Sequence, residues 1–167
     1  VSTVMCNLGF TKAMEAAGID VIQTQVGDRY VLQQLREGGY VLGGEQSGHM
    51  IFLKHNSTGD GLITACQFLS ACLRKGGTVS EVASVMQRFP QELINVKVTD
   101  KHAVTGNDAV AKAIEAGSEK LGDSGRILVR PSGTEPLVRV MVEAPTSEQA
   151  HEVAAEIAEV IEKELGL

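Results

Sequence analysis

Short β-branched runs alternate with amphipathic helical segments along residues 1–92, and this alternation restricts the fold more than any other feature of the chain. The clearest helical pattern spans residues 60–77, where one apolar stripe contains Leu62, Ile63, Cys66, Leu69 and Leu73. The other expected helices are 8–18, 29–39 and 78–89, and the expected strands are 1–6, 19–24, 40–44 and 49–55. This order predicts an α/β layered domain with a mixed sheet.

The pattern changes after Pro90, which we interpret as a hinge into a second unit, so that the expected domains are 1–92 and 93–167. Along the run 137–144, valines at every second position share one face of a strand. Further strands are expected at 93–100 and 125–130, and helices at 107–122 and 147–165. These elements predict a small α+β domain, an antiparallel sheet with helices on one face.

Composition and charge limit the class of function. The net charge is −6 and no basic stripe offsets it, which argues against a nucleic-acid partner. No apolar run is long enough to cross a membrane and no secretory leader is recognisable, so we expect a cytoplasmic protein without a membrane partner. Aromatic residues make up only 4% of the chain and Trp is absent, so the core must be aliphatic.

The cysteines and histidines do not form a recognisable metal or disulfide pattern. Three cysteines are present, an odd number without a C-x-x-C pair, which argues against a disulfide framework and a zinc site. We expect Cys66 and Cys72 to be small core residues of the 60–77 helix. The four histidines are too scattered for a metal constellation, so no metal ligand is expected in this chain.

The loop "RPSGTEP", residues 130–136, is a candidate phosphate site between two strands. Arg130 offers a planar fork of donors that suits phosphate oxygens, Ser132 and Thr134 add hydroxyls, and Gly133 lets backbone N–H groups approach a ligand. Arg139 could point to the same place. The residues alone leave open a second interpretation, a tight turn with a surface ion pair between Arg130 and Glu135.

The loop "GGEQSGH", residues 43–49, is a candidate sugar site. If the chain is extended, Glu45, Ser47 and His49 lie on one side and can hydrogen-bond to vicinal hydroxyls. A glycine-rich hairpin with exposed polar residues is the open alternative. A serine-hydrolase site is disfavoured because G-x-S-x-G is not matched, and a dinucleotide site because no helix follows the glycines.

Two further polar turns precede helices. Asp28 and Arg29 lie in "TQVGDRYV", where they either cap and flank a helix or touch a ligand at the carboxyl end of a strand. The segment "HNSTGDG", residues 55–61, contains good capping residues, and we interpret it as structural.

Taken together, these loops resemble the α-D-phosphohexomutase family over essentially the whole chain. "GGEQSGH" is similar to the sugar-binding loop of that family's third domain, and "RPSGTEPLVRV" to the phosphate-binding loop of its fourth. The segments "VGDRYV" and "STGDG" are similar to flanking family segments. The resemblance therefore implies domain 3 at 1–92 and domain 4 at 93–167.

The resemblance also implies residue roles. The sugar would be held by Glu45, Ser47 and His49, with Gln46 beside them and Asp28 and Arg29 lining the same side. The phosphate that does not react would be held by Arg130, Ser132, Gly133, Thr134 and Arg139. Gln46 is most similar to members that act on glucosamine phosphates. Members acting on mannose or glucose phosphates, and a non-catalytic phosphosugar-binding module, remain alternatives.

The reaction implied is the interconversion of glucosamine 6-phosphate and glucosamine 1-phosphate, on the route to UDP-N-acetylglucosamine and peptidoglycan precursors. It would proceed through a phosphoserine and a glucosamine 1,6-bisphosphate intermediate, supported by Mg²⁺. No phosphoserine loop or acidic metal loop is found here, so these would lie in N-terminal domains 1 and 2 of the same protein. We therefore expect a fragment that is inactive alone, and a homodimer of the full-length enzyme is an arrangement that the resemblance allows.

Overall fold

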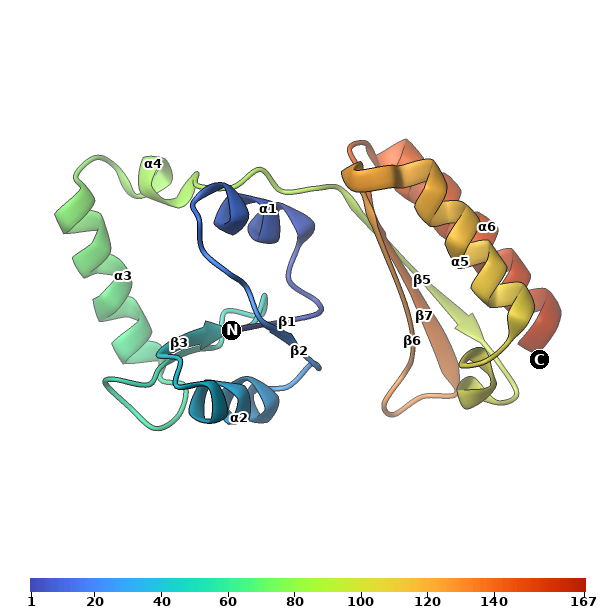
Figure 1. Ribbon diagram of the computed structural model, residues 1–167, viewed down its shortest axis with the longest axis horizontal. Helices are drawn as coiled ribbons and strands as arrows, with labels where there is room; N and C mark the ends of the chain where they lie inside the picture. Colours follow the sequence, from blue (N-terminus) through green and yellow to red (C-terminus); the bar gives the residue numbers. More distant parts are fainter. The chain divides into compact units, whose positions relative to one another are not determined.

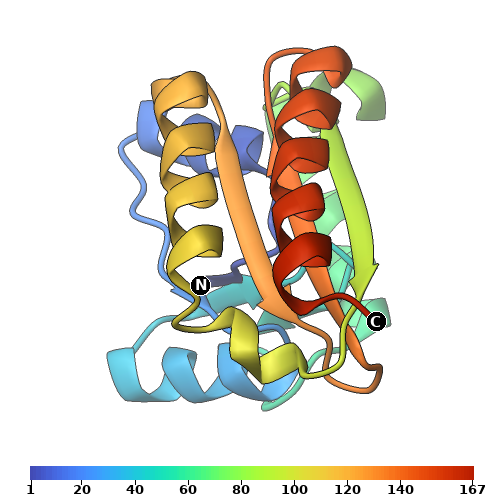
Figure 2. The ribbon, with the colours of Figure 1, turned by 90° about the vertical axis from the view of Figure 1, so that its right-hand side faces the viewer.

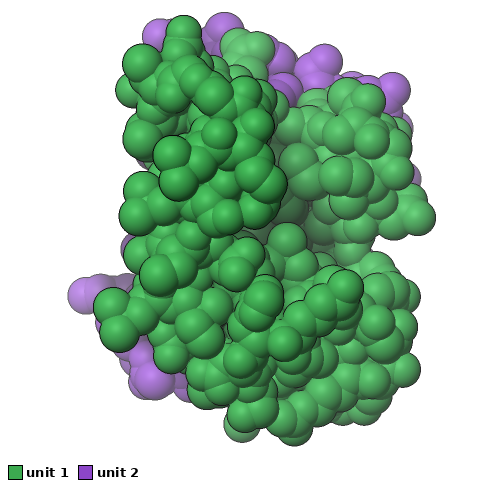
Figure 3. Space-filling model, turned by 90° about the vertical axis from the view of Figure 1, so that its left-hand side faces the viewer, with its two compact units in different colours: residues 1–88 green, residues 89–167 purple.

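The structure is a computed structural model that describes residues 1–167. The chain divides into two compact units, residues 1–88 and 89–167, which are coloured separately in Figure 3 and labelled by element in Figure 1. Each unit is described by itself. The predicted boundary between residues 92 and 93 falls inside the first strand of unit 2.

Unit 1 alternates strands and helices, as the sequence pattern predicts. In chain order the elements are β1 (Ser2–Thr3), α1 (Leu8–Ala16), β2 (Gln23–Thr24), α2 (Asp28–Gly38), β3 (Leu42–Gly44), β4 (Met50–Phe52), α3 (Gly61–Lys75) and α4 (Val79–Ala83). Strands β1 and β2 pair in parallel, and β3 and β4 pair antiparallel. Val1 joins the two pairs, because its amino group donates to the Leu42 carbonyl at 2.9 Å and its carbonyl accepts from the Gly44 N–H at 3.0 Å.

The core of unit 1 is small. Val31 and Leu35 on α2 and Ile51 on β4 are fully buried and pack together. Gly43 on β3 must be a glycine, because a Cβ there would lie 2.6 Å from the Val31 side chain. The first glycine of the 43–49 loop therefore allows helix α2 to approach the strand layer closely.

Helix α3 corrects one part of the sequence interpretation. Cys72 is buried as predicted, but Cys66 is exposed. The apolar stripe, which correctly predicted the helix, faces outward, with Leu62 and Leu73 more than four-fifths exposed. Periodicity identifies a helix and its apolar face, but it does not identify what covers that face.

Unit 2 is a three-stranded antiparallel sheet covered by two helices. Its elements are β5 (Gln91–Lys97), the 3₁₀ helix η1 (Lys101–Val104), α5 (Asp108–Leu121), the 3₁₀ helix η2 (Gly122–Ser124), β6 (Arg126–Pro131), β7 (Leu137–Glu143) and α6 (Ser147–Leu165). The strand order is β5-β7-β6, and both long helices lie on the same face of the sheet (Figure 2). The antiparallel sheet with helices on one face is confirmed.

Alternation along β7 separates the two faces of this sheet. Val138, Val140 and Val142 are completely buried against the helices. They belong to an aliphatic core that includes Ala150, Val153, Ala154, Ile157 and Ile161 from α6, and Val110 and Leu121 from α5. The opposite face of the sheet carries the charged side chains, including the buried Glu143, whose carboxylate accepts from both Nε and Nη2 of Arg126 at 3.1 and 3.0 Å.

Element ends differ from the predictions where local hydrogen bonds compete with regular structure. Helix α4 ends at Ala83 and not near residue 89, and the Ser84 hydroxyl donates to the Glu81 carbonyl at 3.0 Å just past the helix. The first strand is shorter than residues 1–6, because the Thr3 carbonyl accepts from the Cys6 N–H in a turn. The Thr3 hydroxyl also accepts from the Met5 N–H at 3.3 Å, and serine and threonine side chains commonly divert the backbone in this way.

Replacing Ile157 with alanine is expected to destabilise unit 2 by about 2–5 kcal/mol, because a fully buried side chain would leave a cavity. The free energy of unfolding would be measured by urea denaturation of the 167-residue chain followed by circular dichroism. Glu159→Ala, on the exposed side of the same helix, is the control and should change little. Equal effects of the two substitutions would contradict the assigned core.

Candidate functional site

The loop 132–136 between β6 and β7 is held by four hydrogen bonds, three of them within residues 132–137 and one from Val98. The Ser132 N–H donates to the Leu137 carbonyl at 2.9 Å, and the Ser132 hydroxyl accepts from the Glu135 N–H at 3.3 Å. The Leu137 N–H donates to the Glu135 carbonyl, and the Val98 N–H to the Pro136 carbonyl. Ser132 is almost completely buried, so its hydroxyl shapes the loop in addition to being a candidate phosphate-binding group.

The N–H groups of Gly133 and Thr134 are left without an acceptor in the protein, and both residues are exposed. Backbone N–H groups without an acceptor can donate to the oxygens of an anion. The Thr134 hydroxyl is also without a partner. The predicted loop residues are therefore brought together with their donors available.

Arg130 and Arg139 lie directly opposite each other on β6 and β7. Partial burial, and then the adjacent Arg139 guanidinium, lower the pKa of Arg130 from its usual value. Arg130 has no hydrogen-bond or ion-pair partner in the protein, and Nε of Arg139 is buried without an acceptor. Two adjacent guanidinium groups with unused donors favour the binding of an anion between or beside them.

The ion pair of this loop differs from the one that the turn interpretation required. Glu135 pairs with Arg139, through Nη2 at 3.2 Å, and not with Arg130. The Glu135–Arg139 pair is largely exposed and contributes little to stability. It leaves the guanidinium of Arg130 free for a ligand.

Lys101 was missed by the sequence interpretation. Its ammonium group, on η1, donates to the carbonyls of Ser132 at 2.7 Å and Gly133 at 3.2 Å. These bonds orient the two carbonyls toward Lys101 and place a third positive charge at the loop. Lys101 lies about 30 positions away from the loop in sequence and in no recognisable motif, so only the fold shows the contact.

The 43–49 loop is a tight hairpin turn rather than an extended segment. The Gly48 N–H donates to the Glu45 carbonyl, and the Glu45 N–H to the His49 carbonyl, both at 3.0 Å. Gly48 has φ +88°, a conformation that favours glycine. The predicted alternation of Glu45, Ser47 and His49 on one side is therefore wrong, because residues 45–48 close the turn. Ser47 is exposed at its tip and has no partner.

The turn nevertheless brings Glu45 and His49 to the start of helix α2. The Gly27 N–H donates to Oε1 of Glu45 at 3.0 Å, which leaves Oε2 without a partner. Nε2 of His49 lies 3.6 Å from Oδ2 of Asp28, too far for a direct hydrogen bond, and Nε2 itself is buried without a partner. Oε2 of Glu45 is available to sugar hydroxyls, whereas Nε2 of His49 is enclosed by the protein.

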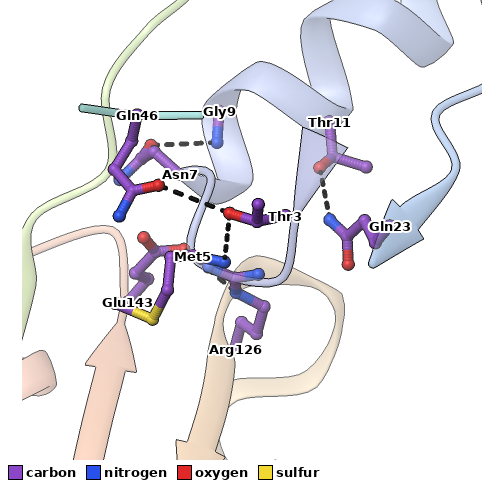
Figure 4. A network of polar contacts seen from close by, with 9 residues as sticks. All are labelled: Thr3, Met5, Asn7, Gly9, Thr11, Gln23, Gln46, Arg126 and Glu143. Atoms are coloured by element: carbon purple, nitrogen blue, oxygen red, sulfur yellow. Dashed lines mark hydrogen bonds and ion pairs between the residues drawn. The ribbon is translucent and has the colours of Figure 1, made fainter. Parts of the chain in front are cut away.

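The remaining predicted residues of unit 1 are placed differently. Oε1 of Gln46 accepts from the Thr3 hydroxyl at 3.4 Å, and Figure 4 shows the two side chains pointing toward one another. The Arg29 guanidinium lies over the Tyr30 ring, 4.5 Å from its centroid, and its Nη2 donates to the Tyr30 hydroxyl. The structure therefore groups Asp28, Glu45 and His49 but turns Arg29 onto its neighbour.

Gly59 supports His49 from the segment interpreted as structural. A Cβ at position 59 would overlap the imidazole ring, so the ring packs directly on the glycine backbone. The next residue, Asp60, accepts from the N–H groups of Leu62 and Ile63 and so caps helix α3, as predicted. One short segment thus fixes both the helix start and the His49 ring.

No group of three or more His, Cys, Asp or Glu side chains is placed to hold a metal ion. No helix has the length and apolar character needed to cross a membrane. The donors described above are instead suited to hydroxyl groups in unit 1 and to an anion in unit 2.

Comparison with protein families assigns both units. Residues 1–89 match the model of "Phosphoglucomutase/phosphomannomutase, alpha/beta/alpha domain III", and residues 93–160 match that of "Phosphoglucomutase/phosphomannomutase, C-terminal domain". The chain is 56% identical over 166 residues to phosphoglucosamine mutase of Bacillus licheniformis and 54% identical over 167 residues to that of Staphylococcus carnosus. The two alignments include 99% and 100% of this chain but only 37% of each relative, in its C-terminal part.

Solved structures show the same fold at low sequence identity. N-acetylphosphoglucosamine mutase of Aspergillus fumigatus matches with a TM-score of 0.83 and 19% identity, over 97% of this chain and 38% of that one. A phosphoglucomutase/phosphomannomutase family protein of Burkholderia thailandensis matches with a TM-score of 0.71 and 19% identity, over 99% of this chain and 38% of that one.

Lys101→Met should loosen the 132–136 loop, because two carbonyls would lose a charged donor. We expect amide exchange at Ser132 in the 167-residue chain to accelerate about fivefold, which corresponds to a net loss of about 1 kcal/mol. Exchange would be followed by NMR, with Lys112→Met as the control, since Lys112 is exposed and unpaired on α5. Unchanged exchange at Ser132 would show that Lys101 does not hold the loop.

Proposed function

The chain belongs to the phosphoglucomutase/phosphomannomutase family, and on this basis we propose that it is the substrate-recognising C-terminal part of a phosphoglucosamine mutase. The full-length enzyme would interconvert glucosamine 6-phosphate and glucosamine 1-phosphate in the cytoplasm, upstream of peptidoglycan precursors. Unit 1 would recognise the sugar and unit 2 the phosphate that does not react. Because the chain spans 37% of its curated relatives, activity requires residues outside it.

The observation that carries this proposal is the set of hydrogen-bond donors at the 132–136 loop. Arg130 and Arg139 lie side by side, no carboxylate of the protein pairs with Arg130, and the N–H groups of Gly133 and Thr134 have no acceptor in the protein. A phosphate dianion has enough acceptor oxygens to use all of these donors. A structural turn would not need two adjacent guanidinium groups, since like charges opposite each other destabilise a sheet.

A phosphate clamp away from the reacting atoms has a clear use in this reaction. The sugar hydroxyl attacks a phosphoserine, the serine–phosphate bond breaks, and glucosamine 1,6-bisphosphate forms. The freed serine then attacks the other phosphate and becomes phosphorylated again. Mg²⁺, bound by residues outside this chain, would neutralise charge on the transferring group. Each half-reaction presents one reacting and one non-reacting phosphate, and binding energy from the latter orients the former.

The sugar would be recognised by Glu45 and His49, with Asp28 behind the imidazole. Oε2 of Glu45 is available to accept from sugar hydroxyl or amino groups, while Oε1 remains bonded to the Gly27 N–H. Ser47 and Gln46 lie beside them on the same turn, and Arg29 would have to leave Tyr30 in order to reach a ligand. The family's name also includes glucose and mannose phosphates, so preference for glucosamine phosphate is the finer part of the proposal.

Arg130→Ala in the full-length enzyme should lower kcat/KM for glucosamine 6-phosphate by a factor equivalent to about 1–3 kcal/mol, through the loss of charge-assisted hydrogen bonds. Arg130→Lys should recover only part of this loss, since it retains the charge but not the planar fork. Arg74→Ala, on the exposed surface of α3, is the control. A kcat/KM that stays at the wild-type value in Arg130→Ala would refute the clamp.

Substitution of Glu45 tests the sugar site. Glu45→Ala should reduce discrimination between glucosamine, glucose and mannose phosphates by about tenfold or less, in keeping with the loss of one hydrogen-bonding group. Glu45→Gln retains an acceptor for the Gly27 N–H and so separates a loss of recognition from a local loss of structure. Ratios of kcat/KM for the three substrates provide the measurement. Wild-type selectivity in both variants would remove Glu45 from the sugar site.

A further inference from the structure

Helix α3 exposes a continuous apolar seam, which we define as Leu62, Cys66, Leu69 and Leu73. These residues follow one another at intervals of four, three and four, so they form one straight stripe along the helix. Leu62, Leu69 and Leu73 are 81%, 56% and 85% exposed, and Cys66 is also exposed. The seam contains no charged or hydrogen-bonding side chain apart from the thiol.

The seam is on the side of α3 opposite the one that packs on unit 1. The half-buried residues Ile63, Thr64, Gln67 and Ala71 occupy the other side of the helix, which contacts β4 and α4. In Figure 1 the helix forms the outer edge of unit 1. Nothing in unit 1 therefore covers the seam.

Unit 1 is also deficient in buried apolar surface. Its core cluster contains only three buried residues, whereas the cluster in unit 2, a unit of similar length, contains fifteen. Val79 and Val85, which follow α3, are more than half exposed as well. The exposure of three leucines in one stripe to water is unfavourable, and their burial against another apolar surface would lower the free energy of the folded protein.

We propose that the seam is the docking surface for the part of the full-length protein that lies N-terminal to this chain. Almost two thirds of each relative's length lies outside the region matched by this chain, and unit 1 corresponds to domain III of that architecture. The covering surface would be aliphatic, because the seam offers nothing to a charged or polar ligand. This excludes the phosphosugar as its occupant, so the inference does not depend on the proposed reaction.

The 4-3-4 spacing also specifies the geometry of the partner. Leucines at these positions pack against another helix or the apolar face of a sheet by inserting between its side chains. Docking would thereby complete the hydrophobic core of unit 1 and hold the sugar-binding turn against the preceding domains, since α3 starts at the segment that supports His49.

Cys66 provides a direct test, because its thiol lies in the middle of the seam. The full-length protein would be treated with N-ethylmaleimide under native conditions, and the labelling of the Cys66 peptide would be followed by mass spectrometry, with the urea-unfolded protein as the fully accessible reference. We expect Cys66 in the native monomer to react at least about tenfold more slowly than in the unfolded protein. Mutase activity plays no part in this measurement.

Variants separate docking from other causes of protection. Leu69→Lys places an ammonium group in the seam and should restore fast labelling of Cys66, whereas Lys75→Gln, which removes one charge from the same helix off the seam, should not. Circular dichroism would establish that both variants are folded. Fast labelling of Cys66 in the native wild-type protein would overturn the proposal. The proposal would also be overturned if Cys66 became protected only when the protein dimerises at higher concentration. In that case a second copy of the chain would cover the seam.

Discussion

The two faces of strand β7 impose the constraint on which the second unit depends. Val138, Val140 and Val142 must face the helices, because they form the centre of the aliphatic core. With the register thus fixed, the residues between them must lie on the other face, and Arg139 must lie opposite Arg130. The proximity of two like charges is unfavourable by itself. A stable core therefore enforces an arrangement that an anion would relieve, and the proposed anion site is positioned by core residues on the opposite face of the strand.

In unit 1 the positions of helix α2 and of the 43–49 turn depend on glycines. Gly43 allows α2 to pack on the strand layer, and Gly48 closes the turn that follows. Once α2 is in place, the N–H of its cap residue Gly27 faces Glu45, and Asp28 lies near His49. The carboxylate of Glu45 is thus fixed by the fold through one oxygen and available through the other. The structural role and the proposed ligand-binding role are thus divided between two atoms of one side chain.

Much of this arrangement could be predicted from the sequence, because periodicity and capping are local properties. The helices 61–75, 108–121 and 147–165 and the antiparallel sheet of unit 2 follow from spacing and from valine alternation. What failed depends on contacts distant in sequence or on competing turns. The extended form of residues 45–49 was displaced by a turn closed at Gly48, and Lys101 reaches the 132–136 loop only through the fold. Cys66 was assigned to the core because an apolar stripe does not reveal its covering surface.

The packing of His49 on Gly59 links two segments that are separate in sequence. A chimera that exchanges only residues 43–49 between relatives would transplant an imidazole without the bare backbone on which it rests. Residues 55–61 would need to be exchanged together with the turn, and with them the Asp60 cap that starts α3. For the engineer who wishes to alter sugar preference, the smallest transferable cassette is therefore two segments with the intervening strand β4, and not the turn alone.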